Sequence, residues 1–313
     1  MTGRRLLLHS LFLFLLPVIV AWWGLSVASA IALVLVALLW RWAISLSAIV
    51  APASMPELEL ETISASHFVE KVRWCMDLLG VDYRERPVGA TLGAFFLGRT
   101  VPVLKFRTGA VRSSIGNSPE ILRYLWGRYS PELGVRAEFL RPTPERLEFE
   151  SRIDSCGTDL QVWVYFHILD DRELTLHAWG ANSPLIPAWQ RLSLRLLYPL
   201  LKLLIRQALR ISPKHHARAV SKVSALLAEV ENRLEDGRQS ILGGDEVNYS
   251  DLAFAAIMGL WLMPPQYGSR RADAVRVSVD RCPAAMQSEI ATWKSAYPRS
   301  AAFIARLYEQ HRR

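Results

Sequence analysis

The sequence predicts a two-domain protein of the α+β/all-α type, in which a βαβ-ββα domain is followed by an all-helical bundle and preceded by two transmembrane helices. Three observations lead to this prediction. Charged residues are rare in residues 1–56, strand and helix patterns alternate over 57–130, and strand patterns are almost absent over 140–313.

The apolar N-terminal segment has room for two helices in a bilayer core of roughly 30 Å. We place them at Leu6–Trp23 and Leu25–Val50, with Gly24 at the turn and a linker to Pro56. Arg41, late in the second span, can reach the same side of the bilayer as the arginines at positions 4 and 5. Because positively charged flanks stay inside, we expect an integral membrane protein whose remaining residues face the cytosol.

Two alternatives to this anchor stay open. The first span is near the lower length limit for crossing a bilayer, so a re-entrant hairpin is possible. The stretch Ala28–Ala30 resembles the cleavage site of a signal peptide, but no clear site closes the first apolar run before the second begins. We favour the anchor.

Charge and cysteine usage restrict the partners. The net charge is +8, yet no nucleic-acid recognition motif accompanies it, so we expect anionic lipid and no nucleic acid. Cys75, Cys156 and Cys282 are far apart and form neither a disulfide framework nor a zinc motif, which fits a reducing cytosol. No metal site is predicted, and His215 and His216 are expected in a solvated loop.

The first domain follows from its apolar periodicity, which predicts strands at Glu59–Ile63, Tyr83–Pro87, Val101–Phe106 and Ala110–Ser113, and helices at Phe68–Leu79 and Ser118–Trp126. Ser66 lies where the first strand gives way to a helix, with its hydroxyl near the unpaired N–H groups of the first turn. It can therefore stabilise a thiolate there, or it can serve as a plain helix cap. Pro102 cannot donate to a sheet, which indicates either a cis-proline turn or an edge strand.

Three motifs in this region carry a resemblance. They are SHFVEKVR at Ser66–Arg73, TVPVL at Thr100–Leu104 and NSPEILRYL at Asn117–Leu125. In order and spacing they resemble the thioredoxin-like N-terminal domain of the cytosolic-type glutathione transferase superfamily, in its serine-type classes. The resemblance implies glutathione as co-substrate, an all-helical second domain and, as in relatives, a possible homodimer.

The resemblance also implies roles for single residues. Ser66 would donate a hydrogen bond to the glutathione sulfur and lower the pKa of the thiol. Val101 would pair its backbone with the cysteinyl part, positioned by Pro102. Ser118 would bind the γ-glutamyl carboxylate at a helix N-terminus, and Arg99 would meet the glycyl carboxylate.

Two positions depart from the family pattern. Asn117 replaces the acidic residue before Ser118, so it can hydrogen-bond to glutathione but cannot pair with its α-ammonium group. His67 replaces the proline after Ser66. We favour His67 as a solvated first-turn residue over one that lines the electrophile side.

The second half has almost no strand signal from Glu145 onward, and apolar residues at helical spacing mark candidate helices at Glu145–Leu169 and Ala217–Leu234. The segment Glu235–Ala256 resembles a conserved stretch of the family, in which Asn248 is a helix N-cap and Asp251 its capping-box partner. Both residues are expected to be structural.

An amphipathic stretch near residues 184–211 separates these helices. Its basic residues follow one helical stripe and its other surface is apolar; the basic residues are Arg191, Arg195, Lys202, Arg206 and Arg210. This pattern is typical of a helix lying in a membrane interface. The alternative is a core helix with a solvated basic face, kinked at Pro199.

The sequence therefore predicts a membrane-anchored glutathione transferase-like protein that activates the glutathione thiol for attack on a hydrophobic electrophile. The alternative is a non-catalytic scaffold or binding module at the membrane. Val69 stands where a cysteine would serve thiol-disulfide chemistry, which argues against a reductase.

Overall fold

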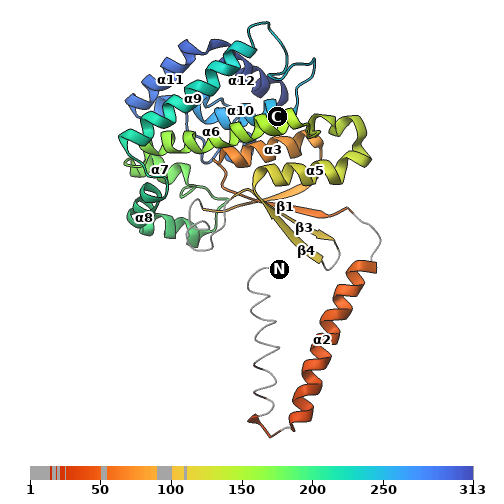
Figure 1. Ribbon diagram of the computed structural model, residues 1–313. Coiled ribbons are helices and arrows are strands. Elements are labelled where there is room, and N and C mark those ends of the chain that lie inside the picture. Colours follow the sequence, from red (N-terminus) through yellow and green to blue (C-terminus); the bar gives the residue numbers. More distant parts are fainter. Residues whose placement is uncertain are drawn as a thin grey trace. The chain divides into compact units, whose positions relative to one another are not determined.

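The computed structural model describes residues 26–50, 55–89, 101–108 and 111–312, together with positions 15, 19 and 22–24 (Figure 1). Of residues 44–50 and 111 it describes the backbone only. The chain divides into two compact units, described separately below: Met1–Glu59 with Asp82–Arg84 and Leu104–Ile115, and Leu60–Val81 with Glu85–Val103 and Gly116–Arg313.

The first unit contains helix α2, Val27–Val50, which coincides with most of the second predicted span. Within the part of the chain that the structure describes, no helix is both long enough and apolar enough to cross a membrane. The first predicted span, Leu6–Trp23, lies mostly outside the described residues.

Four strands form one sheet in the order β2-β1-β3-β4. They are β1 Glu57–Thr62, β2 Tyr83–Pro87, β3 Val103–Thr108 and β4 Val111–Gly116. The alternating sequence of β1 buries Leu58, Leu60 and Thr62 and leaves the glutamates between them at the surface, as the period of two requires.

The register of β1 and β3 follows from two ion pairs. Glu57 pairs with Arg107, and Glu59 pairs with Lys105 at 3.6 Å. As one residue number rises by two, the other falls by two, so the strands are antiparallel. The end of β1 therefore lies beside the start of β3.

Helices α3, His67–Leu79, and α5, Ser118–Leu133, contact each other. Gly80 ends α3 in the left-handed conformation at φ 70°, as expected for a C-terminal glycine. Helix α5 is longer than predicted, because Tyr129 continues its buried stripe beyond Trp126.

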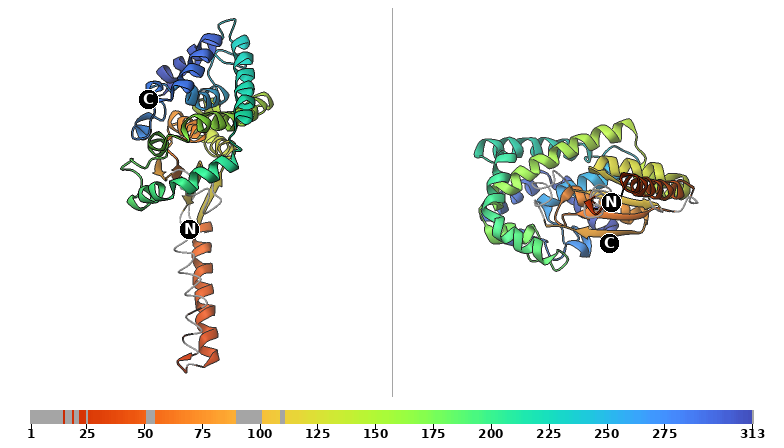
Figure 2. Two further views of the ribbon diagram at one scale, coloured as in Figure 1. Left: turned by 90° about the vertical axis from the view of Figure 1, so that its left-hand side faces the viewer. Right: turned by 90° about the horizontal axis from the view of Figure 1, so that it is seen from below.

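The rest of the chain is helical, as predicted. Its elements are η1 Gly134–Leu140, α6 Pro144–Ile168, α7 Arg172–Ala178, α8 Ala188–Ala208, α9 Pro213–Arg233, α10 Tyr249–Leu262, η2 Ser269–Ala272, η3 Val279–Arg281, α11 Ala284–Ala296 and α12 Pro298–His311. Helix α10 is almost wholly buried and contacts α3, α6 and α12, so it forms the centre of the second unit (Figure 2). It begins with a capping box between Asn248 and Asp251.

Helix α8 has two apolar faces, not one. Leu194, Tyr198, Leu201 and Ile205 are buried in a cluster with residues of α6 and α7, including Leu176. The opposite face is exposed and consists of Trp189, Leu192, Leu196, Leu200 and Leu203. These spacings of three and four residues form one stripe.

The basic residues of α8 lie along the boundary between its two apolar faces, and several make contacts within the protein. Arg195 donates to the Ala181 carbonyl at 3.1 Å, and Lys202 pairs with Asp170 at 2.6 Å. Arg206 also pairs with Asp170, at 2.9 Å. Pro199 lies inside the helix without ending it.

Candidate functional site

The three sequence motifs meet at one end of the sheet. Ser66 follows the end of β1, and Pro102 immediately precedes β3, which lies beside it in antiparallel register. Strands β3 and β4 are neighbours of equal length joined by two residues, so the end of β4 returns to the start of β3. Asn117 and Ser118 follow β4 and therefore come to the same end as Pro102.

Ser66 is the N-cap of α3. Its backbone is extended, and its Oγ accepts the Val69 N–H at a long 3.5 Å. A serine hydroxyl has two acceptor lone pairs and one donor hydrogen. Capping uses only an acceptor, so the Ser66 hydroxyl can still donate to a sulfur atom bound at the N-terminus of the helix. The cap and the thiol-binding role are compatible.

The peptide bond between Val101 and Pro102 is cis, as the motif predicts. Pro102 is buried and Val101 is partly exposed. Strand β3 begins one residue later and lies between β1 and β4, so the edge-strand alternative is wrong. Arg99 lies outside the described residues.

Asn117 and Ser118 open helix α5. Asn117 has φ 70° and ψ 130°, a conformation that costs a non-glycine residue on the order of 1–3 kcal/mol and that clusters at ligand-binding positions. Ser118 is buried, and its Oγ has no hydrogen-bond partner among the described residues. A buried hydroxyl without a partner is unfavourable, and an anion held at the start of α5 would satisfy it.

The prediction for His67 is wrong. Its side chain is buried, and Nε2 donates to the Gly157 carbonyl on α6 at 3.0 Å. Burial lowers the pKa of His67 to about 4, against which the Gly157 hydrogen bond acts weakly, so the ring is neutral at pH 7. Only a neutral, Nε2-protonated ring suits this site, and His67 joins α3 to α6 instead of facing solvent.

Sequence reasoning missed the residues that support the first turn of α3 from the far end of the chain. The Tyr267 hydroxyl donates to the Ala65 carbonyl at 3.3 Å. Glu70 is buried and accepts from Arg73 at 3.0 Å and from Arg312 at 2.8 Å. No local pattern could have found the contacts of Tyr267 and Arg312, because 202 and 242 residues separate them from their partners.

The cysteines of the protein do not supply a reactive thiolate at neutral pH. All three are free and buried. Burial raises the pKa of Cys75 and of Cys156 to about 12, and that of Cys282 to about 11. Their thiols are protonated at neutral pH, so a thiolate at this protein would have to come from a ligand.

Comparison with known proteins supports the resemblance of the region that contains the three motifs. Residues 65–126 match the family model of the glutathione S-transferase N-terminal domain. The match confirms the predicted resemblance for this part of the chain. No curated protein sequence matches the chain.

Similar solved structures include three bacterial proteins. A glutathione S-transferase from Methylobacterium radiotolerans in complex with glutathione sulfonate is 17% identical, with a TM-score of 0.48, over 81% of this chain and 91% of that chain. A theta class glutathione S-transferase from Xanthomonas axonopodis pv. citri with glutathione bound is 18% identical, with a TM-score of 0.43, over 82% and 94%. A β-etherase from Sphingobium sp. strain SYK-6 is 18% identical, with a TM-score of 0.48, over 81% and 95%.

Proposed function

We propose that this chain is a membrane-anchored glutathione transferase-like enzyme that activates the glutathione thiol for attack on an apolar electrophile. One observation carries the proposal. Ser66 and Ser118 stand at the N-termini of two helices that begin at the same end of the sheet, and the buried Ser118 hydroxyl lacks a partner among the described residues. The match of residues 65–126 to the glutathione S-transferase N-terminal domain supports glutathione as the ligand for this arrangement.

In this proposal, different residues bind different parts of glutathione. The γ-glutamyl carboxylate takes the start of α5, where Ser118 Oγ and the first-turn N–H groups donate to it. The backbone at Val101 pairs with the cysteinyl part, and Arg99 meets the glycyl carboxylate. Asn117 hydrogen-bonds to the γ-glutamyl end without the charge of an acidic residue.

Thiol activation falls to Ser66. Its hydroxyl hydrogen donates to the sulfur, and the positive end of α3 favours the thiolate, so the pKa of the bound thiol falls. The thiolate then attacks the electrophilic carbon and forms a C–S bond. The leaving group departs with its electron pair, and the thiol proton passes to water.

Apolar surroundings favour an apolar electrophile. Ile63, three residues before Ser66, packs against a cluster that includes Leu169, Trp179 and Tyr198 of the helical half. An apolar second substrate held near these residues would lie close to the bound thiol.

The anchor and the cytosolic location belong to the same proposal. Large apolar side chains on α2 are exposed, among them Val36 at 62% and Trp40 at 70%. A monomeric soluble protein rarely exposes so continuous an apolar surface, whereas acyl chains would cover it.

The experiment is a pair of serine substitutions. In Ser66→Ala, turnover of a generic electrophile should fall by at least tenfold while glutathione still binds. In Ser118→Ala, the Kd for glutathione should rise about tenfold, the equivalent of one charge-assisted hydrogen bond, with little change in stability because the hydroxyl is unpaired. Ser114→Ala, on the exposed part of β4, is the control.

Calorimetry and a spectrophotometric conjugation assay read the two effects. Normal turnover in Ser66→Ala would remove Ser66 from the mechanism. Glutathione binding without turnover in the unmodified chain would favour the alternative, a binding module at the membrane.

A further inference from the structure

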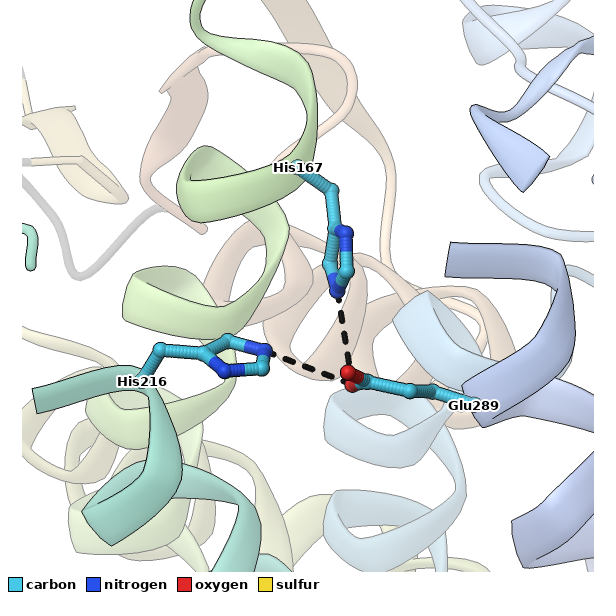
Figure 3. A group of neighbouring side chains, drawn as sticks. All are labelled: His167, His216 and Glu289. Carbon is cyan, nitrogen blue, oxygen red and sulfur yellow. Dashed lines mark hydrogen bonds and ion pairs between the residues drawn. The ribbon is translucent and has the colours of Figure 1, made fainter. Parts of the chain in front are cut away.

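The structure brings together two histidines and a glutamate that no sequence motif connects. Figure 3 shows His167 at the end of α6, His216 in the first turns of α9 and Glu289 on α11, with both imidazole rings directed at the carboxylate. The expectation that His215 and His216 lie in a solvated loop is therefore wrong, because both belong to α9. The side chain of His216 is only 12% exposed.

The separations suit a metal ion. Nε2 of His167 and Nε2 of His216 each lie 3.3 Å from Oε2 of Glu289. One ligand atom from each residue lies within 4.8 Å of the other two. A tetrahedral ion with bonds of roughly 2.0–2.2 Å separates its ligand atoms by roughly 3.3–3.6 Å, so little movement is needed to surround one.

The hydrogen bonding of this group is incomplete without an ion. His216 Nε2 is buried and has no hydrogen-bond partner among the described residues, although the Glu289 oxygen is near. His216 Nε2 points toward the Glu289 carboxylate but makes no hydrogen bond of acceptable geometry with it. A metal ion would use the unshared electron pair of this nitrogen and remove the cost of leaving it unpaired.

The surroundings prepare the ligands. The Trp163 N–H donates to Glu289 Oε2 at 2.6 Å and holds the carboxylate in place. The Phe166 ring stacks on His216 with centroids 4.0 Å apart. Such outer contacts orient metal ligands in proteins.

We propose that His167, His216 and Glu289 bind a divalent transition metal ion of the zinc type. Two imidazoles and one carboxylate are ligands that Zn²⁺ accepts in tetrahedral sites. The Glu289 side chain is 32% exposed, so water can reach the fourth position. The ion would join α11 to α6 and α9, and it shares no residue with the proposed glutathione site.

The test uses the full-length chain in detergent micelles, without a histidine tag and stripped of metal by chelator. Titration with Zn²⁺ at pH 7 should show one ion per chain and a rise in Tm. In His216→Ala the Kd should rise at least tenfold and the Tm rise should disappear. Substitution of the neighbouring His215, whose Nδ1 lies 2.8 Å from Ser212 Oγ, is the matched control, and His215→Ala should bind as the unmodified chain does.

A second variant keeps the test decisive if His216→Ala folds poorly. Glu289→Gln retains the size of the side chain but loses the anionic ligand, and its Kd should also rise at least tenfold. Substitution of Zn²⁺ by Co²⁺ should give the intense visible absorption of a tetrahedral site, which both variants lose. Absence of Zn²⁺ binding, or equal affinity in Glu289→Gln and the unmodified chain, would overturn the proposal.

Discussion

A single glycine sets how closely α3 and α6 approach. A Cβ atom at Gly157 would lie 3.0 Å from Cζ of Phe68 and 3.1 Å from Nε2 of His67. His67 is held in place, since it is buried and hydrogen-bonded to this same residue. The departure from the family pattern at His67 is thus matched by a small residue on the helix that faces it.

We expect Gly157→Ala to lower the free energy of unfolding by about 1–3 kcal/mol, because the added methyl group overpacks this contact. Urea denaturation followed by circular dichroism measures the change. Gly127→Ala is the control, since Gly127 lies in α5 with no atom within 4 Å of an added Cβ. That variant should be unchanged or more stable by about 0.5–1 kcal/mol. An equal effect at both positions would contradict the close contact at Gly157.

At the scale of elements, α8 combines burial with an exposed apolar face. Its exposed stripe includes Trp189 at 66% and Leu196 at 70%, flanked by basic side chains. A core helix with a solvated basic face would expose mainly charge. The stripe therefore favours the membrane-interface alternative for α8 over a core helix with a solvated basic face.

A chain shortened to begin at Met55 tests α8 without the N-terminal segment. It should float with vesicles that contain phosphatidylserine, and binding should weaken as salt is raised, because the basic flank supplies part of the attraction. Leu196→Glu combined with Leu203→Glu should reduce vesicle binding at least tenfold. Val135→Glu, at an apolar position on η1 that is 90% exposed, adds one charge elsewhere and serves as the control. Failure of the shortened chain to bind these vesicles would exclude the lipid contact.

At the scale of the second unit, a buried ion network joins the start of the glutathione-transferase-like domain to the residues after α12. Arg312 donates to Glu70 at 2.8 Å and to Asp77 at 2.6 Å, and Arg73 donates to Glu70 and Glu85. The Glu70, Arg73 and Arg312 side chains are essentially fully buried. Removing one member leaves the network with an unbalanced charge in a place that water does not reach.

Arg312→Met should therefore lower the free energy of unfolding by about 3–5 kcal/mol at pH 7. Arg299→Met, in the exposed first turn of α12, should change it by less than about 1 kcal/mol. Chemical denaturation of both variants measures the difference. Equal stability of the two would mean that the buried network contributes no more than a surface pair.

Acidic pH should reduce the loss of stability that Arg312→Met causes. Burial acts to raise the pKa of Glu70, but the charges of Arg312 and Arg73 hold it below its ordinary value of 4.5. A carboxyl with a lowered folded pKa contributes stability above its unfolded pKa and loses it as pH falls through the folded pKa. The difference in free energy of unfolding between the unmodified chain and Arg312→Met should become smaller below pH 4.5. A difference that stays constant with pH would contradict this role of Glu70.

Much of the fold could be predicted from the sequence. The strand at Tyr83–Pro87 has its predicted bounds, and the helix expected to begin at Phe68 begins one residue earlier. These elements depend on local periodicity and on capping residues, which act between neighbours in the chain. The motif around Pro102 likewise predicts the cis peptide bond that the structure contains.

Other features could not be predicted, because they depend on which surfaces meet. The helical pattern of α8 is visible in the sequence, but only packing decides which apolar face is buried. His67 and His216 carry no local signal of burial, and both make contacts with helices that lie far away in the chain. Burial and hydrogen-bond partners are properties of the folded surface, not of the local pattern.

By itself, the sequence determined the order of the elements and the three motifs that carry the proposed glutathione site, because backbone hydrogen bonding and apolar periodicity are local. The tertiary structure decided that these motifs meet at one end of the sheet, that the Ser118 hydroxyl has no partner among the described residues, and that His167, His216 and Glu289 converge. His167 and Glu289 are 122 residues apart, and only the packing of α6 against α9, with α11 beside them, brings their side chains within reach.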